Sequence, residues 1–158
     1  MPLSKAAEYL LEEARMVLPG MQALFGFQLM AVFSAGFDDK LMVRERYLHL
    51  AATGLVALAI ALVMTPAAFH RQTGPRRVTA DFIRLSSRLL LWSMAPLFLG
   101  LCAEFYIIGR VIAGPVTALW LSAGLLLVFG LLWVMLPRLH RKRVAHLQSD
   151  AGGVGISG

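Results

Sequence analysis

The sequence contains a single cysteine, Cys102, and lacks the motifs of the common enzyme classes. One thiol cannot form a disulfide within the chain, and no set of cysteines and histidines has the spacing of a metal site. The phosphate-binding loop, the zinc-protease helix motif and the nucleophile elbow are all missing. We therefore expect no metal and no cofactor, and nothing in the sequence points to an enzyme.

Long apolar runs, by contrast, fill most of the 158 residues, and 58% of all residues are hydrophobic. Soluble domains average about 45–50% apolar residues. Each run has 20 to 23 residues, enough to cross a hydrocarbon core of about 30 Å as a helix. The runs are 16–37, 47–69, 89–108 and 115–136. They predict an all-α, polytopic membrane protein in which four transmembrane helices form a bundle. A single membrane domain is expected over residues 1–148, followed by a disordered tail over 149–158.

The residues around these runs predict how the helices begin, bend and turn. Ser4–Arg15 places apolar and acidic side chains at helical spacing, which is typical of a short helix lying at the membrane interface. Pro19 suits a first helical turn, so the first membrane helix is expected to begin near Leu18. Pro66 predicts a kink in the second span, and Gly114-Pro115 makes the last two spans antiparallel neighbours.

The net charge of +6 lies in the loops and tails beside the spans. At these positions basic residues favour anionic lipid headgroups as partners rather than nucleic acid. The lipid-binding candidates are Arg76, Arg77, Arg141, Lys142 and Arg143.

The same charges predict the orientation, because cytoplasmic loops are enriched in Lys and Arg. Eleven of the fifteen basic residues fall on the side of the termini: Lys5, Arg15, Arg71, Arg76, Arg77, Arg84, Arg88, Arg138, Arg141, Lys142 and Arg143. Lys40, Arg44, Arg46 and Arg110 fall on the other side. We expect a bacterial inner membrane protein with both termini in the cytoplasm.

Polar residues inside the spans are the candidates for function, because each is costly in hydrocarbon. Glu104 is the only acid well within a span, and His49 is expected at a similar depth on the second helix. A carboxylate and an imidazole in contact can handle a proton. The alternatives are a purely structural pair, or a Glu104 side chain that reaches outward to Arg46 or Arg110. Ser86, Ser93, Leu97, Gly100 and Glu104 share one face of the third span, which is expected to face inward.

Two glutamines, Gln22 and Gln28, lie in the first run, with Gln28 close to mid-depth. Their directions around a helix differ by about 120°, so they cannot both line one narrow wall. Either they form hydrogen bonds between helices, or Gln28 is a polar station for an ion or substrate.

A further group of charged and polar residues is expected at the cytoplasmic edge of the spans. It comprises Glu13, Arg15, His70 and Arg88. These residues would form a collar of ion pairs, a gate, or a contact with lipid phosphate.

The stretch Glu13–Leu29, the segment Thr65–Arg71 and Ser87–Leu89 resemble a family of small bacterial four-helix membrane proteins of unsettled function. Some of its members are labelled sodium:proton antiporter-like. The resemblance is closest over residues 1–95 and implies the same fold. It marks as motif positions Glu13, Arg15, Pro19, Gln22, Pro66, His70 and Arg88.

Two functions follow as hypotheses. The first is a permeation module for a proton, a monovalent cation or a small solute, in which Glu104, His49, Gln28 and Gln22 form the polar site. Since one four-helix protomer leaves little room for alternating access, such a module is expected to be a homo-oligomer. The second is a scaffold or accessory subunit that transports nothing and binds anionic lipid or a partner protein.

Overall fold

The computed structural model describes residues 3–73 and 80–135, and these are helical apart from short turns. The elements are α1 (Leu3–Val32), α2 (Phe37–Lys40), α3 (Val43–Thr73), α4 (Ala80–Ala113), α5 (Pro115–Gly130) and the π-helical turn η1 (Leu131–Met135). No strand occurs within these two ranges, so the prediction of an all-α protein is confirmed.

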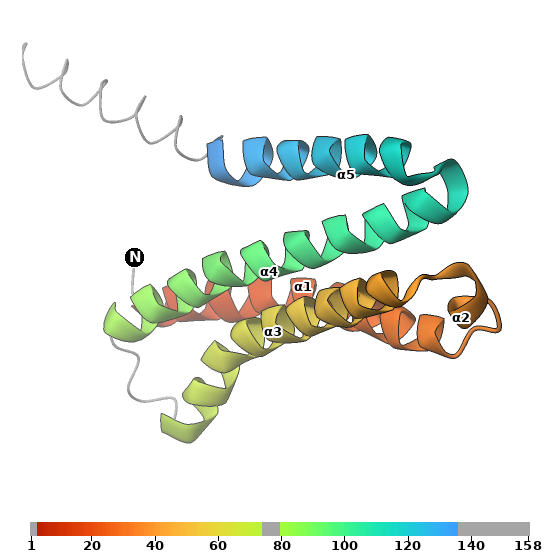
Figure 1. Cartoon of the computed structure of the whole chain (residues 1–158). Helices are drawn as coiled ribbons and strands as arrows, with labels where there is room; N and C mark the ends of the chain where they lie inside the picture. Colours follow the sequence, from red (N-terminus) through yellow and green to blue (C-terminus); the bar gives the residue numbers. More distant parts are fainter. Residues whose placement is uncertain (1–2, 74–79, 136–158) are drawn as a thin grey trace, which may run out of the picture.

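The helices α1, α3 and α4 form the packed part of the molecule, whereas α5 packs mainly against the outer side of α4 (Figure 1). Ala118 is the one buried residue of α5. We refer to the end that carries α2 and the α4–α5 turn as the α2 end. The opposite end carries the beginnings of α1 and α4.

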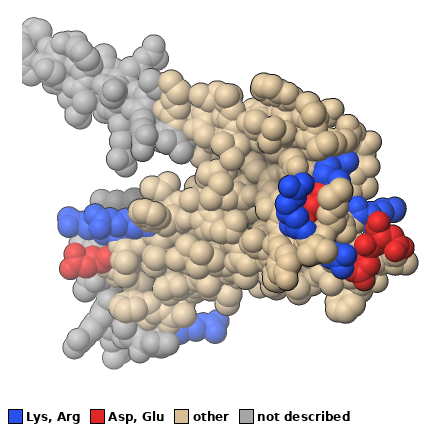
Figure 2. Space-filling view, viewed as in Figure 1, with Lys and Arg blue, Asp and Glu red and all other residues tan. Residues whose placement is uncertain are grey.

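Three of the described helices are long and apolar enough to cross a membrane: Val43–Phe69, Asp81–Ala113 and Pro115–Trp133. The first of the four predicted spans, over 16–37, is not among them. The helix there ends at Val32, and its apolar part includes Pro19, Gln22 and Gln28, which lower its hydropathy. Charged side chains gather at the two ends of the face drawn in Figure 2 and leave a band without charged side chains between them. Together these features support a multi-pass helical membrane protein.

The prediction of a separate interfacial helix over Ser4–Arg15 is wrong, because α1 runs without a break through Pro19. A proline inside a helix removes one backbone hydrogen bond and favours a kink. Here α1 is packed on both sides of the proline: Ala14 and Met21 are buried in one cluster with Ala59 and Val63 of α3. This shared packing stabilises a single helix.

Small residues set the distances between helices in the bundle. A Cβ atom at Gly100 of α4 would lie 3.0 Å from the main-chain oxygen of Ala52, so α3 and α4 pack closely there. Gly114 has φ +86°, a conformation that favours glycine, and it turns the chain so that α5 packs antiparallel to α4. The predicted antiparallel pair is thus confirmed.

The inward-facing stripe on the third span is confirmed as well. Ser86, Ser93 and Gly100 are buried, and Glu104 is partly buried on the same side of α4. The kink predicted at Pro66 is also present. Pro66 lies inside α3, and the last part of that helix (yellow-green in Figure 1) bends away from its main direction. The predicted tail and the lipid-binding candidates Arg76, Arg77, Arg141, Lys142 and Arg143 lie outside the described residues.

Candidate functional site

Three helices bring Gln28, His49 and Glu104 together towards the α2 end. Nδ1 of His49 lies 2.9 Å from Oε1 and 3.2 Å from Oε2 of the Glu104 carboxylate. The side-chain amide of Gln28 donates a hydrogen bond to the same carboxylate over 3.1 Å. The His49 and Glu104 side chains are only 6% and 14% exposed, so the three groups form a polar cluster inside the bundle.

Two further contacts hold the histidine ring, and a third holds the main chain of His49. Its Nε2 lies 3.0 Å from the main-chain oxygen of Gln28, and Phe37 packs edge-on against it with ring centroids 5.3 Å apart. One turn further along α3, the hydroxyl of Thr53 donates to the main-chain oxygen of His49 over 2.9 Å. The ring therefore has one orientation, with a different hydrogen-bond partner at each nitrogen.

This orientation determines how the protons are arranged. A main-chain carbonyl can only accept, so Nε2 of His49 must carry a hydrogen and donate it to Gln28. At Nδ1, one more proton is needed for a hydrogen bond with Glu104. It resides either on the imidazole, which gives an ion pair, or on the carboxyl, which gives a neutral pair. In both forms the His49–Glu104 pair has zero net charge, and loss of the proton leaves it with one negative charge.

A groove of about 580 Å³ lies over this cluster. Gln28, His49 and Glu104 supply its polar wall, and apolar side chains of α1 and α4 make up most of the remainder. Gln28 is only 4% exposed, and its amide oxygen is buried and has no hydrogen-bond partner among the described residues. The cluster thus contains one buried acceptor without a partner among the described residues.

A second buried pair, Glu45 with Arg110, closes the α2 end and was not predicted. Glu45 is 1% exposed and also accepts a hydrogen bond from the main-chain N–H of Met42, while Arg110 reaches the main-chain oxygen of Lys40. The pair ties the start of α3 to the end of α4. The sequence shows a carboxylate in the first turn of a helix, which is a capping signal. It does not show that this carboxylate pairs with an arginine 65 residues away.

The alternative in which Glu104 reaches Arg46 or Arg110 is wrong, because each arginine has another partner. Arg110 pairs with Glu45, and Arg46 pairs with Asp38 at 2.7 Å. Gln22 does not belong to the cluster either, since it is exposed on α1.

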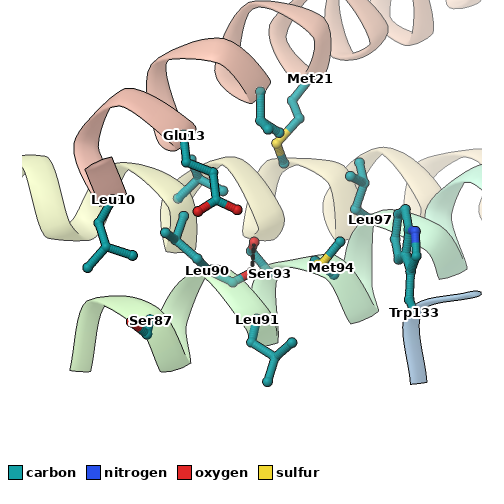
Figure 3. Close-up of a pocket in the computed structure, with 12 residues that line it drawn as sticks. Leu10, Glu13, Met21, Ser87, Leu90, Leu91, Ser93, Met94, Leu97 and Trp133 are labelled. Atoms are coloured by element: carbon teal, nitrogen blue, oxygen red, sulfur yellow. Dashed lines mark hydrogen bonds between the residues drawn. The ribbon is translucent and has the colours of Figure 1, made fainter. Parts of the chain in front are cut away.

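The predicted collar at the opposite end does not form a network of ion pairs among its described side chains. Glu13, Arg15 and Arg88 are exposed, and no ion pair joins these three; the side chain of His70 lies outside the described part. Glu13 instead points from α1 into a cavity of about 400 Å³, towards Leu90 and Ser93 of α4 (Figure 3). The cavity is otherwise mainly apolar and extends to Trp133.

The two hollows lie on either side of the contact at Gly100. Their α4 residues are Ser87–Leu97 in the cavity and Glu104–Ile112 in the groove. Between them, Gly100 lies against Ala52 and Val56 of α3. A layer of close packing therefore separates the carboxylate of Glu13 from that of Glu104.

A family model matches residues 3–137 of this chain. The chain belongs to the family of unknown function DUF6328. No curated protein and no solved structure matches it. Membership extends over all the described helices and assigns no activity, so the function has to be argued from the site.

Proposed function

We propose that this protein is a permeation module that exchanges a proton for a monovalent cation across the bacterial inner membrane. In this proposal α1 crosses the membrane as a fourth span, both termini are cytoplasmic, and the working unit is a homo-oligomer. The sodium:proton antiporter-like label of the resembling family agrees with this class of function.

The observation that carries the proposal is the single proton shared by His49 and Glu104. While the proton is present, the pair is neutral and compatible with an apolar surrounding. When the proton leaves, one negative charge remains inside the bundle, and a buried charge is stable only if it is paired. A monovalent cation restores neutrality, so proton and cation compete for one position, which is the requirement for exchange.

The two hollows support a path to each side of the membrane. The groove leads from the cluster to the α2 end, and the cavity at Glu13 opens towards the opposite end. Exchange without leak requires that the two are not connected at the same time. The contact at Gly100 provides such a barrier, and a shift of α4 against α3 would be needed to pass it.

Purified protein in liposomes that contain a pH-sensitive dye tests the proposal. We expect an imposed gradient of a monovalent cation, tested with sodium, potassium and an organic ammonium salt in turn, to drive proton movement in the opposite direction. Glu104→Gln removes the titrating group but keeps a hydrogen-bonding side chain of similar size, so it should reduce this flux to that of empty liposomes. Asp39→Asn makes the same chemical change at an exposed position of α2 and should leave the flux intact.

If the folded and inserted wild-type protein shows no proton flux with any of these monovalent cations, the proposal is overturned. The function as a scaffold or accessory subunit would then take its place. Flux that persists in Glu104→Gln would refute the role of Glu104 in exchange.

A further inference from the structure

We propose that the cation admitted to the groove over Glu104 is an amphipathic organic ammonium ion that enters sideways from the bilayer. The inference rests on the proposed exchange at the His49–Glu104 pair and names the substrate class for it. Three properties of the groove support it: its size and lining, its number of free oxygen ligands, and its opening to the side.

The groove is much larger than a metal ion and has the character of an organic binding site. Pockets for small organic molecules measure about 300–1,000 Å³ and combine apolar walls with a few polar groups. The groove, at about 580 Å³, fits this description, with Leu24, Phe27 and Ile107 among its apolar lining residues. An ion without an apolar body would leave most of this surface without a contact.

The polar wall also has too few free oxygens for a dehydrated metal ion. Hard metal cations in proteins take about six or more oxygen ligands. The Glu104 carboxylate lines the groove, and the amide oxygen of Gln28 is buried without a hydrogen-bond partner among the described residues. The main-chain oxygen of Gln28 is engaged by His49. A protonated amine needs only two or three acceptors, because it has at most three N–H donors.

The exposed side chains around the groove indicate where a ligand enters. Phe27 of α1 and Ile112 of α4 line it and are 75% and 79% exposed. In a membrane these side chains contact lipid, so the groove opens towards the bilayer as well as towards the α2 end. An amphipathic cation concentrates in that region, and Phe27 and Phe37 place aromatic rings along its path.

One residue of the groove, Lys40, has the same charge as the proposed ligand. Its replacement therefore tests whether the groove binds a cation or an anion. Its side chain extends over Gly36, with Nζ 3.5 Å from the position of a Cβ there. A lysine at the rim lowers the affinity for a cation and raises it for an anion. Removal of its charge should therefore strengthen binding of an organic cation.

The experiment is calorimetry on the protein in nanodiscs, with empty nanodiscs subtracted and with two probes of equal shape and opposite charge. The probes are 1-adamantylammonium and 1-adamantanecarboxylate. We expect the ammonium to bind at least about tenfold more tightly than the carboxylate, because the deprotonated pair is an acceptor site with one negative charge. Titrations in buffers of different ionisation enthalpy should show release of close to one proton per ammonium bound.

Variants assign the binding to the groove. Glu104→Gln should weaken ammonium binding at least about tenfold and abolish the proton release. Gln28→Leu should weaken binding while the release persists, and Lys40→Gln should strengthen it. Asp39→Asn, an exposed charge change next to Lys40, should alter neither quantity.

Equal affinity for both probes, tighter binding of the carboxylate, or ammonium binding that is unaffected by Glu104→Gln would overturn the inference. These results are independent of the liposome assay. Metal-driven proton flux without ammonium binding would support the proposed exchange and refute only the organic ammonium ion as its substrate. Ammonium binding with proton release, but without metal-driven flux, would support the organic cation as the exchanged species.

Discussion

Nδ1 of His49 lies 2.9 Å from the carboxylate of Glu104, although the two residues are 55 positions apart in the sequence. The contact joins the first part of α3 to the last part of α4. Because the other ring nitrogen donates to a main-chain oxygen, the hydrogen bond between the two side chains depends on one shared proton.

His49→Gln removes the proton carrier while it keeps a side chain that can donate to Glu104. We expect cation-driven proton flux in liposomes to fall to that of empty liposomes, with little change in the thermal midpoint of unfolding. Tyr47→Phe, at an exposed position of the same helix, is the control and should retain full flux. A His49→Gln protein with normal flux would show that the imidazole is not part of the exchange site.

The buried pair of Glu45 and Arg110 is expected to contribute strongly to stability. Arg110→Gln leaves the Glu45 carboxylate buried without its partner, and breaking such a pair costs about 3–5 kcal/mol. The exposed pair of Asp38 and Arg46 is a control at the same end of the molecule, and Asp38→Asn should cost less than about 1 kcal/mol. Unfolding in detergent by denaturant, followed by circular dichroism, measures both. Similar losses in the two variants would contradict the difference in burial.

How far the sequence predicts this molecule differs between the helices and the contacts among them. Apolar length predicts α3, α4 and α5, because a helix is the structure that satisfies its own backbone in lipid. The course of α1 was mispredicted since local signals at Pro19 favour a helix start, whereas packing of Ala14 and Met21 on α3 holds one continuous helix.

At the site, periodicity correctly placed Glu104 on the inner face of α4 and at the depth of His49. It could not reveal that Gln28 joins them or that Gln22 does not, because the rotation of α1 about its axis depends on its neighbours. The partner of Glu45 could not be predicted either, since nothing local to Arg110 distinguishes it from other arginines at a helix end.

The contact of Gly100 with α3 predicts that alanine substitution lowers stability at Gly100 but not at Gly124. Gly100→Ala would bring a Cβ to 3.0 Å from the main-chain oxygen of Ala52 and to 3.1 Å from Cγ2 of Val56. Such overpacking costs about 1–3 kcal/mol, so the thermal midpoint should fall. Gly124→Ala in α5 has no atom within 4 Å of the new Cβ and should have no destabilising effect. If Gly100→Ala were as stable as Gly124→Ala, α3 and α4 could not approach each other as closely as they do here.

Whether α1 crosses the membrane can be measured from its two ends, because Glu8 and Asp39 are exposed at opposite ends of the described helices. In a Cys102→Ala background, Glu8→Cys and Asp39→Cys each provide one thiol for a membrane-impermeant maleimide. The native Cys102 is buried, so its replacement by alanine leaves the surface unchanged. If α1 spans and both termini are cytoplasmic, Asp39→Cys is labelled in intact spheroplasts, and Glu8→Cys is labelled only after the membrane is permeabilised. Labelling of both positions from one side would mean that only α3, α4 and α5 cross, with α1 packed along them on a single side of the bilayer.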